Sequence, residues 1–233
     1  MPMTRAEKAR RTRQRMLDAA ARLFTERGWT RTTVEDVARA AEVGVQTVYF
    51  TFGTKRALLK EVLDVAVAGD TDPVATLDRP WAREVLAEPD PAAQLARQAA
   101  GARRVLERAA PVLEVVRTAA AAEPELAGLW RLNREQRHTV QLRFAEALVA
   151  KTALRDGHDA ASAADIALTI LGPETYDLLV TGRGWTADRW ERWAADALVR
   201  QLLPRPSTPV PPAPAPPAPA PPAPAPPVPA QPA

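Results

Sequence analysis

Three neighbouring side chains have the types that recognise base edges in a DNA groove. Gln46 carries an amide that can bond bidentately to adenine, Thr47 can bond a base or a phosphate, and Val45 offers an apolar contact to a thymine methyl group. Residues of these types reach the bases when they lie in the first turn of a helix that enters the major groove. Their chemistry therefore depends on the elements that surround them.

The sequence around these residues predicts two short helices joined by a tight turn. Apolar residues at i, i+3, i+4 and i+7 from Val34 mark the first helix, and either Thr32 or Thr33 can be its N-cap. The periodicity breaks at residues 42–44, and Gly44 is a tolerable N-cap for a second helix over residues 45–52. This is a helix-turn-helix pattern, although two short amphipathic helices can also be plain core in an all-helical protein.

The residues from Thr32 to Leu59 resemble the signature of TetR-family transcriptional regulators. The matching positions are Thr32, Thr33, Val34, Val37, Ala38, Ala41, Val43, Thr47, Val48, Tyr49, Phe52, Lys55, Leu58 and Leu59. Two positions depart from it, because Glu42 replaces the usual turn glycine and Gly44 replaces a serine that caps the recognition helix and often touches a phosphate. The resemblance implies two sets of DNA contacts, to phosphates from Thr33, Thr47, Tyr49, Thr51 and Lys55, and to the groove from Val45, Gln46 and Phe50.

Charge is concentrated at the same end of the chain. Residues 1–60 hold 13 Lys and Arg against 6 Asp and Glu, whereas the remainder holds 18 against 22. Neutralisation of phosphates supplies most non-specific affinity for DNA, so this asymmetry favours a DNA-facing N-terminal end. A helix from about Arg5 to Arg27, ended by Gly28, completes a predicted three-helix DNA-binding domain over residues 1–54.

The rest of the chain predicts an all-α protein, with a larger antiparallel helical domain over residues 55–203. Helices are expected at 55–68, 92–108, 111–122, from Pro124 to before Gly157, at 160–171, 173–180 and 187–203, with short helices and turns over residues 69–90. Pro124 is expected to open the longest of them, and Thr186 to cap the last.

Composition excludes several classes of protein. The chain has 233 residues, 46% of them hydrophobic, and no cysteine, which rules out disulfides and thiolate metal sites. Because no apolar stretch of ~18 residues occurs, we expect no membrane span and a cytoplasmic protein. His138 and His158 alone make an incomplete metal site, so no metal or cofactor is expected. No catalytic motif stands out, and a small helical enzyme using either histidine is a remote alternative.

The resemblance implies that the larger domain binds a small-molecule effector and pairs two subunits. From the residues, the apolar stripe of segment 187–203 must bury against something, either the chain's own core or a partner helix, and we favour the partner. The predicted dimer interface comprises Leu168, Leu171, Trp190, Trp193, Ala197 and Leu198. Polar and aromatic residues predicted to line an effector pocket are Trp130, Arg134, Arg137, His138, Gln141 and Tyr176.

The segment from residue 204 to residue 233 differs from everything before it. It contains 16 prolines and a PPAPA repeat, which predict an extended or disordered tail without a core. Such a tail can be passive, act as a spacer, or recruit a proline-binding partner.

These features together predict a homodimeric, ligand-responsive repressor. It would bind a pseudo-palindromic double-stranded operator and leave it when a small molecule binds the larger domain. The alternative is a helical protein-interaction module with a recruiting proline-rich tail and only non-specific affinity for DNA.

Overall fold

The computed structural model describes residues 4–205, and every regular element in that range is helical, which confirms the all-α prediction. The prediction for the proline-rich tail falls almost wholly on residues 206–233, outside the described range. The helices are α1 (Arg5–Arg27), α2 (Val34–Ala40), α3 (Val45–Phe52), α4 (Lys55–Ala68), α5 (Pro80–Ala87), α6 (Pro91–Ala119), α7 (Pro124–Val149), α8 (Ala160–Ile170), α9 (Pro173–Tyr176) and α10 (Ala187–Leu202). Short 3-10 turns lie at Thr76–Asp78 and Arg155–Gly157, and a π-helical turn at Asp177–Gly182 follows α9.

Local capping explains why the N-terminal helices begin and end where the sequence predicts. The Thr4 hydroxyl accepts from the Glu7 N–H, and the Glu7 carboxylate accepts from the Thr4 N–H, so a capping box starts α1. At the other end Gly28 adopts a φ of 78° and donates its N–H to Phe24. Thr54 caps α4 in the same way as Thr4 caps α1, through the N–H of Ala57.

Helix α6 runs without a break through Pro111, so the prediction of two separate helices there is wrong. Proline removes one backbone hydrogen bond, but its ring here is exposed and the residues that follow it are buried. The packing of Val112, Leu113 and Val116 outweighs the lost bond. As a result α6, with 29 residues, is longer than α7, with 26, which was expected to be the longest helix.

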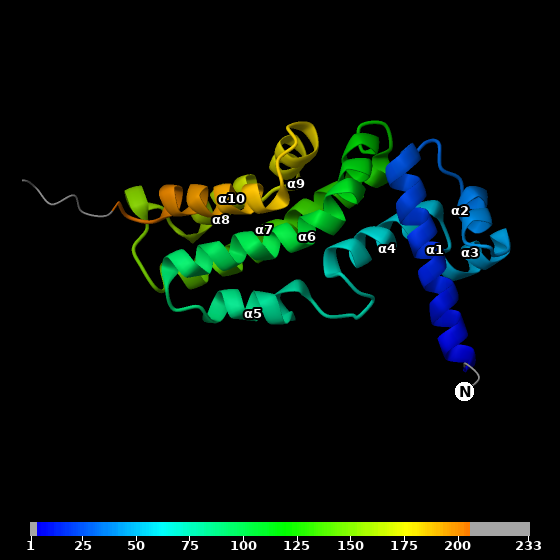
Figure 1. The fold of residues 1–233 in the computed structure, drawn as a ribbon, viewed down its shortest axis with the longest axis horizontal. Helices are drawn as coiled ribbons and strands as arrows, with labels where there is room; N and C mark the ends of the chain where they lie inside the picture. Colours follow the sequence, from blue (N-terminus) through cyan, green and yellow to red (C-terminus); the bar gives the residue numbers. More distant parts are fainter. Residues whose placement is uncertain (1–3, 206–233) are drawn as a thin grey trace, which may run out of the picture.

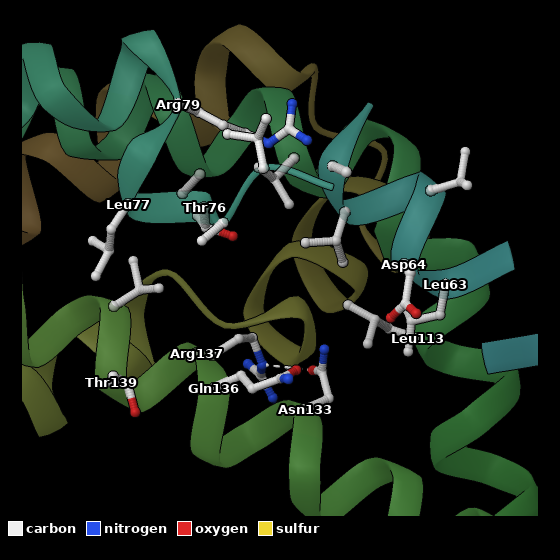
Figure 2. A pocket seen from close by; sticks show the side chains of 18 of the residues that line it. Leu63, Asp64, Thr76, Leu77, Arg79, Leu113, Asn133, Gln136, Arg137 and Thr139 are labelled. Carbon is white, nitrogen blue, oxygen red and sulfur yellow. Dashed lines mark hydrogen bonds between the residues drawn. The ribbon is translucent and has the colours of Figure 1, made fainter. Parts of the chain in front are cut away.

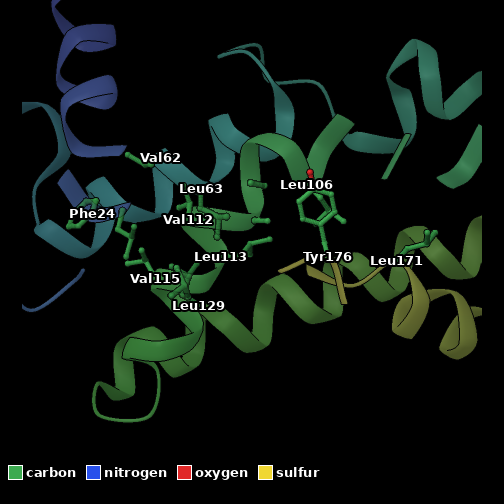
Figure 3. Packing of buried hydrophobic residues seen from close by; sticks show 14 of the residues in the cluster. Phe24, Val62, Leu63, Leu106, Val112, Leu113, Val115, Leu129, Leu171 and Tyr176 are labelled. Atoms are coloured by element: carbon green, nitrogen blue, oxygen red, sulfur yellow. The ribbon is translucent and has the colours of Figure 1, made fainter. Parts of the chain in front are cut away.

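The helices form an elongated body with α1, α2 and α3 gathered at one end (Figure 1). Helix α4 packs on both α1 and α6, α7 packs on α6 and α8, and α10 packs on α6 and α8. One continuous cluster of buried side chains joins α1 to α10, and Figure 3 shows it passing from Phe24 through Leu63 and Leu113 to Leu171. A separate small cluster of Ala82, Val85 and Phe144 attaches α5.

The apolar stripe of α10 is buried inside the chain, which corrects half of the predicted dimer interface. Trp190 and Leu198 are fully buried and Leu171 is 5% exposed, because the stripe packs on α6 and α8 of the same chain. The Trp190 ring meets Tyr176 edge-on, with centroids 5.0 Å apart. Leu168, Trp193 and Ala197 remain partly exposed.

Candidate DNA-binding site and ligand cavity

Helix α2 begins with a capping box built on Thr33, the second of the two threonines predicted as N-cap. The Thr33 hydroxyl accepts from the Asp36 N–H at 3.1 Å, and the Asp36 carboxylate accepts from the Thr33 N–H at 3.2 Å. The bond from the Thr33 N–H and a second one from the Thr33 hydroxyl to the carboxylate lower the pKa of Asp36. Thr32 is instead buried, with its hydroxyl 3.0 Å from the Leu23 carbonyl and 2.9 Å from that of Gly28. The start of α2 is thereby tied to the end of α1.

A Schellman motif ends α2 and forms the turn of the helix-turn-helix. The Val43 N–H donates to the Ala38 carbonyl at 3.0 Å, and the Glu42 N–H donates to the Arg39 carbonyl at 3.2 Å. The motif requires a left-handed residue, and Glu42 supplies it with a φ of 55°. Glycine is the usual residue here because a Cβ is strained in this conformation. The turn therefore has the usual hydrogen bonds of a Schellman motif, but its left-handed position holds a glutamate in place of glycine.

Replacing Glu42 with glycine is expected to stabilise the protein. Relief of the left-handed strain exceeds the extra chain entropy of glycine, and the 3.6 Å pair between Arg15 and Glu42 is too exposed to contribute much. We expect Glu42→Gly to raise the free energy of unfolding, measured in urea, by about 0.5–1 kcal/mol. Glu42→Ala removes the same ion pair but keeps the strain, so it should gain nothing. Equal stability of the two variants would contradict this account of the turn.

Helix α3 buries one face and exposes the residues predicted to contact DNA. Val48 and Phe52 pack inward, whereas Tyr49 is 42% exposed and Phe50 is 94% exposed. Gln46 and Thr47 are also exposed, Val45 is half-buried, and the Thr51 hydroxyl donates to the Thr47 carbonyl. Gly44 is the N-cap, and it offers no side chain to the free N–H groups of the first turn. Those N–H groups remain available to an acceptor from outside the helix.

Lys55 points into the protein rather than toward the surface expected to meet DNA. Its ammonium donates to the Trp29 carbonyl at 2.6 Å and lies 4.0 Å from the centroid of the Trp29 ring. Burial lowers the pKa of Lys55. In this conformation the residue joins the start of α4 to the loop after α1, and its contact with a phosphate stays a prediction.

Part of the basic run in α1 also serves the fold. Arg13 pairs with Glu61 of α4, and its guanidinium lies 4.8 Å from the centroid of the Phe52 ring in α3. Arg15 faces Glu42 in the turn. These contacts fix α3 against α1 and α4, while Arg10 and Arg11 stay exposed.

A cavity of about 680 Å³ lies between α4, the segment that follows it, α5, α6 and α7. Its volume is in the range of small-molecule sites, ~300–1,000 Å³. Most of the wall is apolar, with contributions from Leu63, Leu106, Leu129, Val140 and Phe144. Figure 2 shows Asn133 and Arg137 on α7 facing Thr76, Leu77 and Arg79 across the cavity.

The structure brings only two of the six predicted pocket residues, Arg137 and Gln141, to this cavity. Tyr176 is buried against Trp190, and Trp130 lies behind Arg137, with the guanidinium carbon 5.4 Å from its ring centroid. Arg134 is exposed, and His138 faces Asp165 of α8 at 3.3 Å.

Among the polar residues of the cavity that the sequence analysis did not identify, two are buried, Gln98 and Asn133. Both are buried, with Gln98 3% and Asn133 7% exposed. The signal that could have found Asn133 is its spacing, since residues 133, 137 and 141 are four apart and share one helix face.

Residues 4–205 contain neither a metal-binding cluster nor a membrane-spanning helix. No group of three or more His, Cys, Asp or Glu side chains is arranged to hold a metal ion. No helix there is long and apolar enough to cross a membrane.

Comparison with known proteins supports the assignment of the N-terminal site. Residues 16–62 match the family model described as bacterial regulatory proteins, tetR family. Over 58 residues the chain is 40% identical to the HTH-type transcriptional regulator TtgR of Pseudomonas putida. This alignment covers 25% of this chain and 28% of TtgR. The probable regulator ArpR of the same species matches to the same extent. The match thus spans little more than a quarter of these relatives' length.

Solved structures extend the likeness to the whole helical body. The repressor NalD of Pseudomonas aeruginosa superposes with a TM-score of 0.64 at 22% identity, covering 84% of this chain and 98% of NalD. A transcriptional regulator from Saccharomonospora viridis, solved with choline, superposes with a TM-score of 0.62 at 18% identity. The superposition covers 83% of this chain and 98% of that regulator. At these identities the likeness concerns the fold.

The fold and the N-terminal site together resemble those of helix-turn-helix transcriptional regulators. Within that class, residues 16–62 are similar to the N-terminal segment of the TetR family of bacterial regulatory proteins.

Proposed function

We propose that the chain is a homodimeric, ligand-responsive repressor that binds a pseudo-palindromic operator. Residues 1–54 are the DNA-binding domain, residues 55–203 bind the effector and the second subunit, and residues 204–233 form a tail. The observation that carries this proposal is the exposure of α3, where Phe50 is 94% exposed and Tyr49 42% while the opposite face of the helix is buried. The exposed aromatic side chains of Tyr49 and Phe50, close to Gln46, are typical of a surface that binds another molecule.

Within this proposal, the residues of α3 divide by their position. Val45, Gln46 and Phe50 face the bases, and Thr33, Gly44, Thr47, Tyr49 and Thr51 contact the phosphate backbone. At Gly44 the contact comes from the free backbone N–H groups of the first turn, because the side chain that the family usually supplies is missing. Lys55 contributes by holding α4 against Trp29.

A dimer would place two recognition helices at a fixed spacing, and partly exposed apolar residues of α8 and α10 form the interface we assign to it. The half-buried side chains of Leu168 on α8, and of Trp193 and Ala197 on α10, stay at the surface after the rest of the apolar stripe has packed inside. We assign this face, together with the neighbouring partly exposed Ile166 and Ile170, to the second subunit. A two-fold pair is needed to place two recognition helices roughly 34–36 Å apart on DNA.

The effector acts through α4, which forms one wall of the cavity and begins directly after the recognition helix. Leu63, Asp64 and Val67 of α4 line the cavity, and the same helix packs on α1. A ligand that prefers one placement of α4 would therefore also select one placement of α3, since only differential affinity shifts such an equilibrium. NalD is described as a repressor and the Saccharomonospora viridis regulator was solved with a small molecule, and both descriptions agree with this assignment.

The proposal is tested by selecting bound fragments from genomic DNA with the purified full chain, followed by footprinting on the enriched fragments. The expected result is protection of an inverted repeat, with affinity that falls steeply as salt rises. Uniform binding to all fragments, with no protected repeat, would refute sequence-specific regulation.

A further inference from the structure

Polar side chains of α7 form a row along one side of the cavity. Asn133, Arg137 and Gln141 lie four residues apart on α7, and Gln98 of α6 meets the last of them. Leu129, Val140 and Phe144 flank the row on the same helix. A ligand on this side of the cavity therefore meets a line of hydrogen-bonding groups beside apolar side chains. Further polar lining residues, among them Thr76 and Arg79, lie on the opposite side.

The row is rich in hydrogen-bond donors. The Asn133 carbonyl oxygen accepts from the Arg137 Nε at 3.0 Å, and the Gln141 carbonyl oxygen accepts from the Gln98 amide at 2.5 Å. Asn133 and Gln141 can offer a ligand the donors of their NH₂ groups, besides the remaining lone pair of each carbonyl oxygen. The guanidinium between them adds further N–H donors.

The positive charge of Arg137 is only loosely neutralised. Its nearest carboxylate oxygen is on Glu174 of α9, 3.7 Å away, which is longer than a hydrogen bond. The Glu174 side chain is 50% exposed, whereas that of Arg137 is 20% exposed. Burial lowers the pKa of Arg137, yet a guanidinium remains charged in proteins. A buried cation with a distant, solvated partner can gain from a closer anion.

The acidic side chains that line the cavity do not oppose an anion at this position. Asp64 pairs with Lys60 at 2.5 Å, and Asp70 forms two bonds with Arg79, at 2.7 and 3.0 Å. Glu61 pairs with Arg13, and Asp72 lies on the exposed segment before α5. All four belong to α4 and the segment that follows it, across the cavity from α7 (Figure 2).

We propose that the effector is an amphipathic organic anion, an apolar molecule with one carboxylate, whose carboxylate pairs with Arg137 between the amides of Asn133 and Gln141. Its apolar part fills the space among Leu106, Leu129 and Phe144. This inference rests on the proposed function, because it names the chemical class that the effector cavity accepts. A planar guanidinium binds a carboxylate bidentately, which selects against alcohols and cations of the same shape.

The test compares octanoate, octan-1-ol and octylamine, which share one chain and differ in the head group. Calorimetric titration of the full chain is expected to show octanoate binding at least tenfold more tightly than octan-1-ol, and octylamine more weakly than either. Arg137→Gln should remove the preference for octanoate, and Arg137→Lys should keep part of it. Arg134→Gln, an exposed arginine on the same helix, is the matched control and should keep all of it.

Three outcomes would overturn the proposal. These are binding of octylamine as tight as that of octanoate, an equal loss in the Arg134 and Arg137 variants, or no binding of any of the three probes. The titration contains no DNA, so it is independent of the operator test. An Arg137-dependent preference for octanoate in a chain that selects no DNA sequence would leave this inference standing and refute the regulator.

Discussion

Trp190→Ala is expected to lower the free energy of unfolding by about 3–5 kcal/mol. The Trp190 side chain is fully buried between α10 and the helices beneath it, and its ring packs edge-on to Tyr176. Truncation leaves a large cavity that the surrounding helices can fill only in part. Since domains are stable by only ~5–15 kcal/mol, the loss should be plain in a urea titration followed by circular dichroism.

Two variants separate this core role from a role between subunits. Trp190→Phe keeps an aromatic ring and removes an indole N–H that has no partner among the described residues, so it should cost less than about 1.5 kcal/mol. Trp193→Ala, three residues along α10, should lower the free energy of unfolding less than Trp190→Ala does, because the Trp193 ring is only partly buried against the core and Trp185. It should also shift the monomer–dimer equilibrium measured by sedimentation. If Trp190→Ala instead dissociated a dimer of otherwise stable subunits, the placement of its ring in the core would be wrong.

Gln46→Ala is expected to weaken operator binding by about 1–3 kcal/mol per half-site, or about 5- to 150-fold, if the amide contacts one adenine bidentately. The side chain is exposed in the first turn of α3, where base contacts are expected. The loss should be confined to operator DNA, because removal of a neutral amide leaves phosphate neutralisation unchanged. Fluorescence anisotropy on operator and scrambled duplexes measures both affinities at one salt concentration.

The matched control for Gln46→Ala is Gln14→Ala. Gln14 is exposed on α1, where its amide bonds Asp18 on the same helix. This variant should bind both duplexes as the parent chain does. A uniform loss on operator and scrambled DNA in the Gln46 variant would show that the amide reads no base.

The N-terminal helices could be predicted closely because their boundaries are set locally. Thr4, Gly28, Thr54 and Gly69 each cap a helix through hydrogen bonds to residues three or four positions away. Such signals are visible in the sequence without knowledge of the fold. The bounds of α1, α3 and α4 agree with the prediction for this reason.

The errors arose where distant residues decide the outcome. Pro111 ends a helix by local rules, yet burial of Val112 and Val116 keeps α6 continuous. The apolar stripe on α10 shows that one face of the helix must be buried. Periodicity does not identify whether helices of the same chain or of a second subunit bury it. The polar row of the cavity was found only in part, because Gln98 reaches Gln141 across 43 positions of sequence.

The unbroken core from α1 to α10 has a consequence for how the protein changes state (Figure 3). Val48 and Phe52 of the recognition helix belong to the same core cluster as Leu63 and Leu113 of the cavity wall, so a change in the placement of α3 is expected to repack this core. Close-packed interiors have a few discrete arrangements rather than a continuum of them. We therefore expect the protein to exchange between two defined conformations separated by a barrier. The populations of these two conformations, and not a gradual change in the tilt of α3, would then set how much operator is occupied.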